Sequence, residues 1–234
     1  ERQRLLAVRQ AAAKVTSITI PSQVTRNHYV AVAHQNWPTH SWAVCDLGIK
    51  AGEHTNGCFW LSVVAGWSRT ARIDYAGNAE LEKLAAEVFK LHDVDPALWH
   101  DQRPGRQPID FLADRLRQMI CGANGYMRQP RQQALRGPAF AAVQGLNLQD
   151  GSMASYSTWL TSVAEHQFAD ELVLAATADL LRLCIVTVPS RAHWACSWHP
   201  DEEVHAQRGI QLQHHIVLGN DDVHYVWLHK LPAC

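Results

Sequence analysis

Residues 56–67, NGCFWLSVVAGW, form the most informative stretch of the sequence. After Asn56 and Gly57 the stretch is apolar nearly all round, with aromatic and branched side chains at most positions. A helix that is apolar on every side is a buried helix, because none of its faces can be left in water. We therefore predict a helix in the interior of the molecule, with its amino end at Cys58.

Amphipathic segments follow this stretch along the chain. Apolar residues recur at helical spacing in four windows, residues 79–91, 109–121, 156–164 and 170–183. Between the second and third windows the periodic signals are few, and we predict a long surface loop with one short helix at residues 122–155.

Most of the predicted strands lie in the second half of the chain. Short apolar or alternating runs are found at residues 184–188, 193–198, 210–218 and 224–228, and the turn sequence GNDD separates the last two. The expected fold class is therefore α+β, with a mixed or antiparallel sheet built mostly from the C-terminal half and packed between helices.

The first forty residues are predicted to extend this domain. We predict a helix at residues 2–15 and strands at 16–21, 28–33 and 41–47. Residues 1–40 are accordingly assigned to an N-terminal extension, a helix plus short strands, that packs on the core. Residues 41–234 form the main domain.

The composition excludes several classes of protein. Of the 234 residues 47% are hydrophobic and 18% are charged, and the net charge is −1, so the chain can build a core and has no general attraction for nucleic acid or anionic membranes. The six cysteines are scattered without a CxxC pair, which fits a reducing compartment. We expect a cytoplasmic monomer that has no secretory signal and binds neither nucleic acid nor membrane.

Cys58 is the candidate nucleophile. The positive end of a helix favours a thiolate, and the free N–H groups of the first turn can bind an oxyanion. Gly57 has no side chain, so a substrate chain can approach closely. The same pattern also fits a cysteine that serves only as a small buried hydrophobic residue.

His224 is the candidate general base. The chain has 14 histidines, so the presence of a histidine carries no information by itself. His224 differs in its setting, because it begins the predicted strand HYVWL directly after the GNDD turn. A strand end at a turn can hold an imidazole ring rigidly beside a thiol. An ordinary histidine on a surface strand is the alternative.

Three segments in order resemble the ovarian-tumour (OTU) family of cysteine deubiquitinases. Residues 56–60, NGCFW, look like the family's cysteine box; residues 168–188 are similar to its aromatic-X-X-Glu-Leu helix leading into an Ile-X-Val strand; and His224-Tyr225 resembles its His-Tyr box. The resemblance covers roughly residues 46–231 and implies a papain-like OTU fold with residues 41–234 as the catalytic domain. It also implies hydrolysis of bonds at the ubiquitin C-terminus without cofactor or metal, and ubiquitin or polyubiquitin chains as partners.

The resemblance also assigns the surroundings of the nucleophile. It implies an oxyanion hole made of backbone N–H groups of Thr55, Asn56 and Gly57, and a narrow channel for the Gly-Gly tail of ubiquitin. The bulky side chains that could line this channel are Trp60, Tyr225 and Trp227, although Trp60 and Trp227 fit the core equally well.

Two positions depart from the family pattern. Thr55 stands where the family usually has Asp, and Val226 stands where it often has an Asp or Asn that orients the histidine. The orienting residue must then come from elsewhere, with Asp46, Asn220 and Asp222 as candidates, or the site works as a Cys-His dyad. These departures point to a divergent member, which would act in the host cytoplasm if it is an effector.

Other functions stay open from the sequence. A catalytically weak OTU-like module that only binds ubiquitin is one, and a papain-like hydrolase acting on another modifier or protein is a second. A zinc site is a third, since His193, Cys196 and His199 recur at spacing three. Residues three apart point to opposite faces of a strand, and no second cluster completes four ligands, so we expect no metal.

Overall fold

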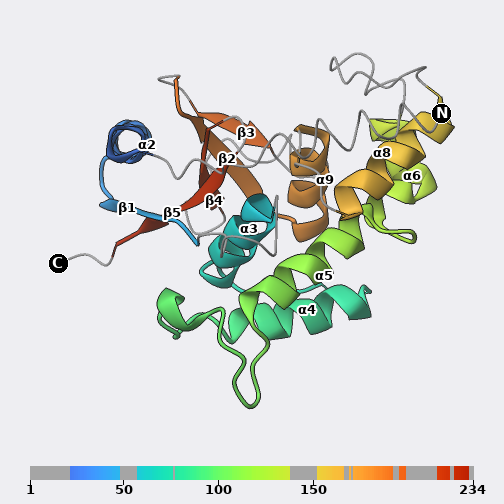
Figure 1. Ribbon diagram of the computed structural model, residues 1–234, viewed down its shortest axis with the longest axis horizontal. Helices are drawn as coiled ribbons and strands as arrows, with labels where there is room; N and C mark the ends of the chain where they lie inside the picture. The colour runs from blue at the N-terminus through green and yellow to red at the C-terminus, as the bar shows by residue number, and fades with distance from the viewer. Residues whose placement is uncertain are drawn as a thin grey trace, which may run out of the picture.

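A five-stranded sheet between helices forms the centre of the molecule (Figure 1). The computed structural model describes residues 22–47, 57–75, 77–137, 152–165, 169, 171–191, 195–198, 215–221 and 224–231. The strand order is β1-β5-β4-β2-β3, and all pairs are antiparallel except β2 with β4. The predicted α+β class with a mixed sheet is confirmed.

Four of the strands come from the second half of the chain, as predicted. These are β2 (Cys184–Pro189), β3 (Cys196–Trp198), β4 (His215–Asn220) and β5 (Tyr225–Lys230). The fifth, β1 (Trp42–Cys45), confirms the strand predicted at residues 41–47 and forms one edge of the sheet. This edge strand brings the N-terminal part of the chain beside β5.

Side chains of the sheet alternate between two apolar layers. Ile216 and Leu218 of β4 belong to the large core cluster around α3 (Cys58–Ser68), whereas Val217 belongs to a second cluster on the opposite face. Because successive residues of a strand point to opposite faces, both faces need cover, and the strands are apolar at nearly every position. The sheet therefore lies between helices, as predicted.

Helix α2 (Gln23–Asn36) covers the second face, and the predicted strand at residues 28–33 is wrong. Ser22 caps the helix by accepting a hydrogen bond from the N–H of Thr25 at 3.1 Å. Tyr29, Val32 and Ala33 are buried against the sheet, a spacing of three and four that belongs to a helix face. The assignment of residues 1–40 to an extension stays a prediction.

Helix α3 confirms the buried helix predicted from NGCFWLSVVAGW. All of its residues are buried, from Cys58 to Ser68. It lies against β4 and β5 on one side and against the helices α4 (Ala79–Phe89) and α5 (Ile109–Cys121) on the other. Gly66 is required for the contact with β4, because a Cβ atom there would overlap the side chain of Ile216.

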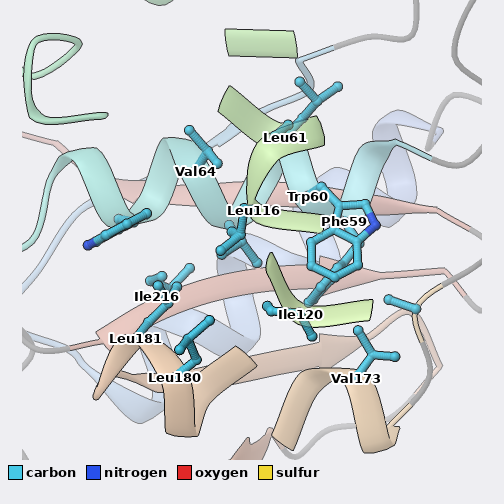
Figure 2. Packing of buried hydrophobic residues seen from close by; sticks show 14 of the residues in the cluster. Phe59, Trp60, Leu61, Val64, Leu116, Ile120, Val173, Leu180, Leu181 and Ile216 are labelled. Atoms are coloured by element: carbon cyan, nitrogen blue, oxygen red, sulfur yellow. The ribbon is translucent and has the colours of Figure 1, made fainter. Parts of the chain in front are cut away.

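Four further helices complete the core on the α3 side of the sheet. They are α4 (Ala79–Phe89), α5 (Ile109–Cys121), α8 (Met153–Glu165) and α9 (Glu171–Leu181), each within a few residues of its predicted bounds. Figure 2 shows side chains of α3, α5, α9 and β4 meeting in this core, among them Phe59, Ile120, Val173 and Ile216. The short 3₁₀ helix η1 (Pro96–Leu98) stands in the connection between α4 and α5.

The predicted surface loop at residues 122–155 is more structured and more buried in its first half than expected. It contains a 3₁₀ helix, η2 (Tyr126–Arg128), and the short helix α6 (Pro130–Arg136). Met127 and Gln132 are buried, and Arg128 donates hydrogen bonds to Ser157 and Thr161 of α8. Residues 138–151 lie outside the described part. In the described part, no helix combines the length and apolar character needed to cross a membrane.

Candidate active site

The candidate site lies where three distant segments meet. Helix α3 begins there with Cys58, β1 has just ended before Asp46, and β5 is about to start after His224. Antiparallel pairing of β1 with β5 sets Cys45 opposite Trp227, so Asp46, one residue further along, and His224, three residues before Trp227, lie at the same end of this strand pair. The sheet register therefore brings two sequence-distant polar residues together.

Cys58 is the first residue of α3 and is 4% exposed. Its Sγ accepts a hydrogen bond from the backbone N–H of Tyr225 at 3.4 Å. The first intrahelical bond runs from the N–H of Leu61 to the carbonyl oxygen of Gly57 at 2.9 Å. The N–H groups that precede it in a helix have no intrahelical acceptor, so they lie beside the thiol as hydrogen-bond donors and partial positive charge.

His224 and Asp46 form a buried pair. The Nε2 atom of His224 lies 3.3 Å from Oδ1 of Asp46, and their side chains are 2% and 9% exposed. The other carboxylate oxygen of Asp46 accepts a hydrogen bond from Arg26 of α2 at 3.3 Å. Arg26 thus balances the charge of Asp46, and Asp46 fixes the orientation of the imidazole ring.

The surroundings of His224 favour its protonated form. Burial alone lowers the pKa of His224, but the hydrogen bond to Asp46 and the interaction with the Cys58 thiol outweigh it and raise this pKa to about 9. Nδ1 is buried and has no well-aligned hydrogen bond to any residue in the described ranges.

Of the other two orienting candidates, the structure describes Asn220. Its side-chain amide donates to the hydroxyl of Tyr225 at 3.4 Å. Asp222 lies outside the described residues, so its role stays a prediction. Of the two candidates that the structure describes, Asp46 has the hydrogen bond to His224.

Of the predicted oxyanion-hole residues, the structure describes Gly57, the N-cap of α3. Thr55 and Asn56 lie outside the described part of the chain. Their role therefore stays a prediction, and so does that of Gly57.

The three residues predicted along the substrate channel are buried. Trp60 is 1% exposed and packs edge-on against Phe59, and Trp227 is 4% exposed and stacks on Trp99. Tyr225, 7% exposed, contacts Cys58, the candidate nucleophile, through its backbone N–H. Trp60 and Trp227 are thus core residues in this structure, and a channel beside them stays a prediction.

The zinc alternative falls largely outside the described residues, which exclude His193, His199 and the side chain of Cys196. Among the residues that are described, no group of three or more His, Cys, Asp or Glu side chains could hold a metal ion.

Sequence reasoning missed two contacts beside the site. Arg26 lies between the strands predicted at residues 16–21 and 28–33, so no element was predicted there and its approach to Asp46 from a helix was not expected. His100 bonds both Asp110 and the carbonyl oxygen of Leu47, the residue after Asp46. No local motif marks His100, because the meeting depends on how a loop between two helices folds back.

Comparison of the chain with models of protein families and with curated proteins gives no match. The geometry of the site and the ordered sequence motifs therefore carry the functional argument.

Proposed function

We propose that the chain is a cysteine-dependent deubiquitinase, which hydrolyses isopeptide or peptide bonds at the ubiquitin C-terminus through an acyl-enzyme. The observation that carries the proposal is the meeting of Cys58, His224 and Asp46, contributed by three segments far apart in the sequence. A thiol at a helix amino end, a histidine beside it and a carboxylate behind the histidine are the parts that nucleophilic cysteine catalysis needs.

His224 has distinct tasks for its two ring nitrogens. Nε2 is within hydrogen-bond distance of the Asp46 carboxylate, which can only accept, so Nε2 carries a proton that it donates to Oδ1. This leaves Nδ1 to exchange a proton with Cys58. With the pKa of His224 near 9, the ring holds both protons at neutral pH and can supply one to a leaving group.

The reaction follows from these assignments. The Cys58 thiolate, whose proton His224 has taken, attacks the carbonyl carbon of the terminal glycine and forms an S–C bond. Backbone N–H groups at the start of α3 and at residues 55–57 receive the oxyanion. The C–N bond then breaks as His224 gives its proton to the leaving amine. Water attacks the thioester, His224 takes a proton from that water, and the Cys58 thiolate leaves.

The choice of ubiquitin rests on the sequence. The cysteine box, the helix-strand segment and the His-Tyr box occur in the OTU order, and the site residues of the first and last motifs lie together in space. The departure at Val226 is compensated in this proposal by Asp46, which approaches the imidazole from β1 rather than from the strand of the histidine.

The test is hydrolysis of ubiquitin that carries a fluorogenic amide at its C-terminus. We expect turnover by the parent protein, none by Cys58→Ala, and near-parental turnover by Cys121→Ala, which alters a buried cysteine of α5 outside the site. Cleavage of another modifier instead of ubiquitin would replace the substrate in this proposal. Binding of ubiquitin by a folded parent protein without any turnover would replace it with the binding-module alternative.

A further inference from the structure

His100 lies between two hydrogen-bond acceptors. Its Nδ1 is 2.7 Å from Oδ2 of Asp110, and its Nε2 is 3.0 Å from the backbone carbonyl oxygen of Leu47. An ionised carboxylate and a carbonyl oxygen accept hydrogen bonds and donate none. Both contacts are therefore hydrogen bonds only when both ring nitrogens carry protons, that is, when His100 is an imidazolium.

The Leu47 contact lies one residue from the proposed catalytic machinery. Leu47 is 7% exposed and belongs to the core around α3, so its side chain is fixed by packing and its carbonyl oxygen by His100. Asp46, the preceding residue, divides its carboxylate between His224 and Arg26. A displacement of the Leu47 peptide would move the Asp46 carboxylate relative to the imidazole of His224.

His100 follows a residue that is fixed in the core, in a loop that is tied to α5. The preceding residue, Trp99, is fully buried, and its ring stacks on Trp227 of β5 with centroids 5.8 Å apart. The carbonyl oxygen of Trp99 accepts a hydrogen bond from the N–H of Ile109 at 2.8 Å, which ties the loop to the start of α5. Asp110 stands in the first turn of α5, where the helix end favours a carboxylate.

We propose that His100 is a positioning residue for Asp46: paired with Asp110, it holds the Leu47 backbone and so keeps the Asp46 carboxylate aligned on His224. The inference rests on the proposed role of the Cys58–His224–Asp46 site and adds a second His-Asp pair behind it. In the described residues, the charged groups around this pair include Asp101 in the same loop and Arg106, which bonds the carbonyl oxygens of Leu98 and Asp101. Asp114 and Arg117 of α5 line one pocket together with Asp110.

The first test reads the titration of His224 and does not depend on ubiquitin. NMR of ring-labelled histidine should give a pKa of about 9 for His224 in the parent protein. In His100→Ala this pKa should fall toward the ordinary value, because the Asp46 hydrogen bond that raises it is loosened. His100→Gln keeps an amide donor near the Leu47 carbonyl oxygen and should give an intermediate value.

His92→Ala is the matched control. His92 also donates a hydrogen bond to a backbone carbonyl oxygen, that of Ser68 at 2.9 Å, but at the carboxyl end of α3. Its loss should leave the His224 titration at the parental value. An unchanged titration in folded His100→Ala, or an equal shift in His92→Ala, would overturn the proposal.

The second test uses pH to separate a charged His100 from a neutral one. We expect His100→Ala to lower kcat roughly 10- to 100-fold with little change in KM, since misalignment rather than substrate binding is affected. Asp110→Asn keeps the shape but removes the charge that favours imidazolium, so its kcat/KM relative to the parent should be low at pH 8 and recover toward pH 6. A ratio of one at every pH would contradict the role of Asp110.

The rate of Cys58 alkylation by iodoacetamide gives a second readout. Peptide mass spectrometry measures this rate, and each variant is compared with the parent at the same pH values. This readout keeps the two proposals apart. If the protein does not cleave ubiquitin but His100→Ala still changes the His224 titration and the Cys58 alkylation rate, the proposed substrate is refuted and the positioning role of His100 stands. An active protein without that response would refute the positioning role alone.

Discussion

The two ends of helix α3 carry similar polar groups and differ in what those groups bond. At the carboxyl end, the hydroxyls of Ser68 and Thr70 donate to the carbonyl oxygens of Ala65 and Trp67 at 2.7 Å and 2.9 Å. His92 donates to the carbonyl oxygen of Ser68. Each of these bonds satisfies a carbonyl group that the last turn of a helix leaves open, so the end is closed by its own polar groups.

The amino end is arranged in the opposite way. Gly57 has no side chain with which to cap the helix, and Cys58 stands where the first-turn N–H groups point. The histidine at this end, His224, meets a carboxylate and a thiol rather than a backbone carbonyl. The two histidines therefore differ in their partners: His92 bonds a backbone carbonyl oxygen, as a structural role requires, and His224 has the carboxylate and thiol partners that the proposed chemical role requires.

Cys58→Ala should have the largest effect, because it removes the candidate nucleophile at the amino end of α3. The proposed hydrolysis of ubiquitin amides should be lost, because the thiol that forms the thioester is removed, while the fold is retained after so small a change. Steady-state kinetics and circular dichroism measure the two effects. Cleavage that persists in the variant would show that the nucleophile is another residue.

Asp46→Asn should have the next largest effect. Without the carboxylate, the hydrogen bond and the charge that raise the pKa of His224 are lost and burial remains, so this pKa should fall. We expect kcat to drop about 100-fold or more and the alkaline limb of the kcat/KM profile to move to lower pH.

Glu87→Gln, which removes an ion pair with Lys90 on α4, is the control for Asp46→Asn and should leave the profile unchanged. An alkaline limb that stays in place in Asp46→Asn would mean that Asp46 does not set the protonation of His224.

The stability of the fold should depend on pH through His224. A pKa raised from 6.5 to about 9 on folding contributes stability that is fully present below pH 6.5 and is lost as the pH rises through 9. Urea unfolding should therefore give a larger loss between pH 6.5 and 9.5 for the parent than for His224→Gln. Equal losses would argue against a protonated His224 in the folded protein.

His92→Ala should have the smallest effect. It removes one hydrogen bond at the carboxyl end of α3, which costs about 1 kcal/mol of unfolding free energy or less for an exposed side chain. The variant should hydrolyse substrate at the parental rate, as a thermal melt and a kinetic assay can establish. A large loss of activity would mean that the two ends of α3 are not separable.

The sequence predicted those elements whose pattern is local. The helix expected at residues 109–121 spans Ile109–Cys121, because its apolar positions recur with helical period and Gly122 ends it. The strand predicted at residues 28–33, HYVAVA, was wrong, because a window of six residues alternates well enough to suggest a strand. The helical face of Tyr29, Val32 and Ala33 and the cap at Ser22 become visible only over a longer window.

In the candidate site, too, the residues with a local sequence signal could be predicted, and those that only the tertiary fold brings together could not. Cys58 and His224 stand in recognisable settings, before an apolar helix and after a turn, so their candidacy follows from the sequence. Asp46 could be named only as one of three carboxylate or amide candidates, since its meeting with His224 depends on the register of β1 and β5. His100 and Asp110 gave no signal, because a loop folded against the core brings them to Leu47.

The most direct test of the account is a covalent one. The protein should be incubated with ubiquitin that carries a cysteine-reactive group at its C-terminus, alongside Cys58→Ala and Cys121→Ala, and the products weighed by intact mass spectrometry. We expect one ubiquitin adduct on the parent and on Cys121→Ala, and none on Cys58→Ala. An adduct on Cys58→Ala, or no adduct on a folded parent protein, would contradict it.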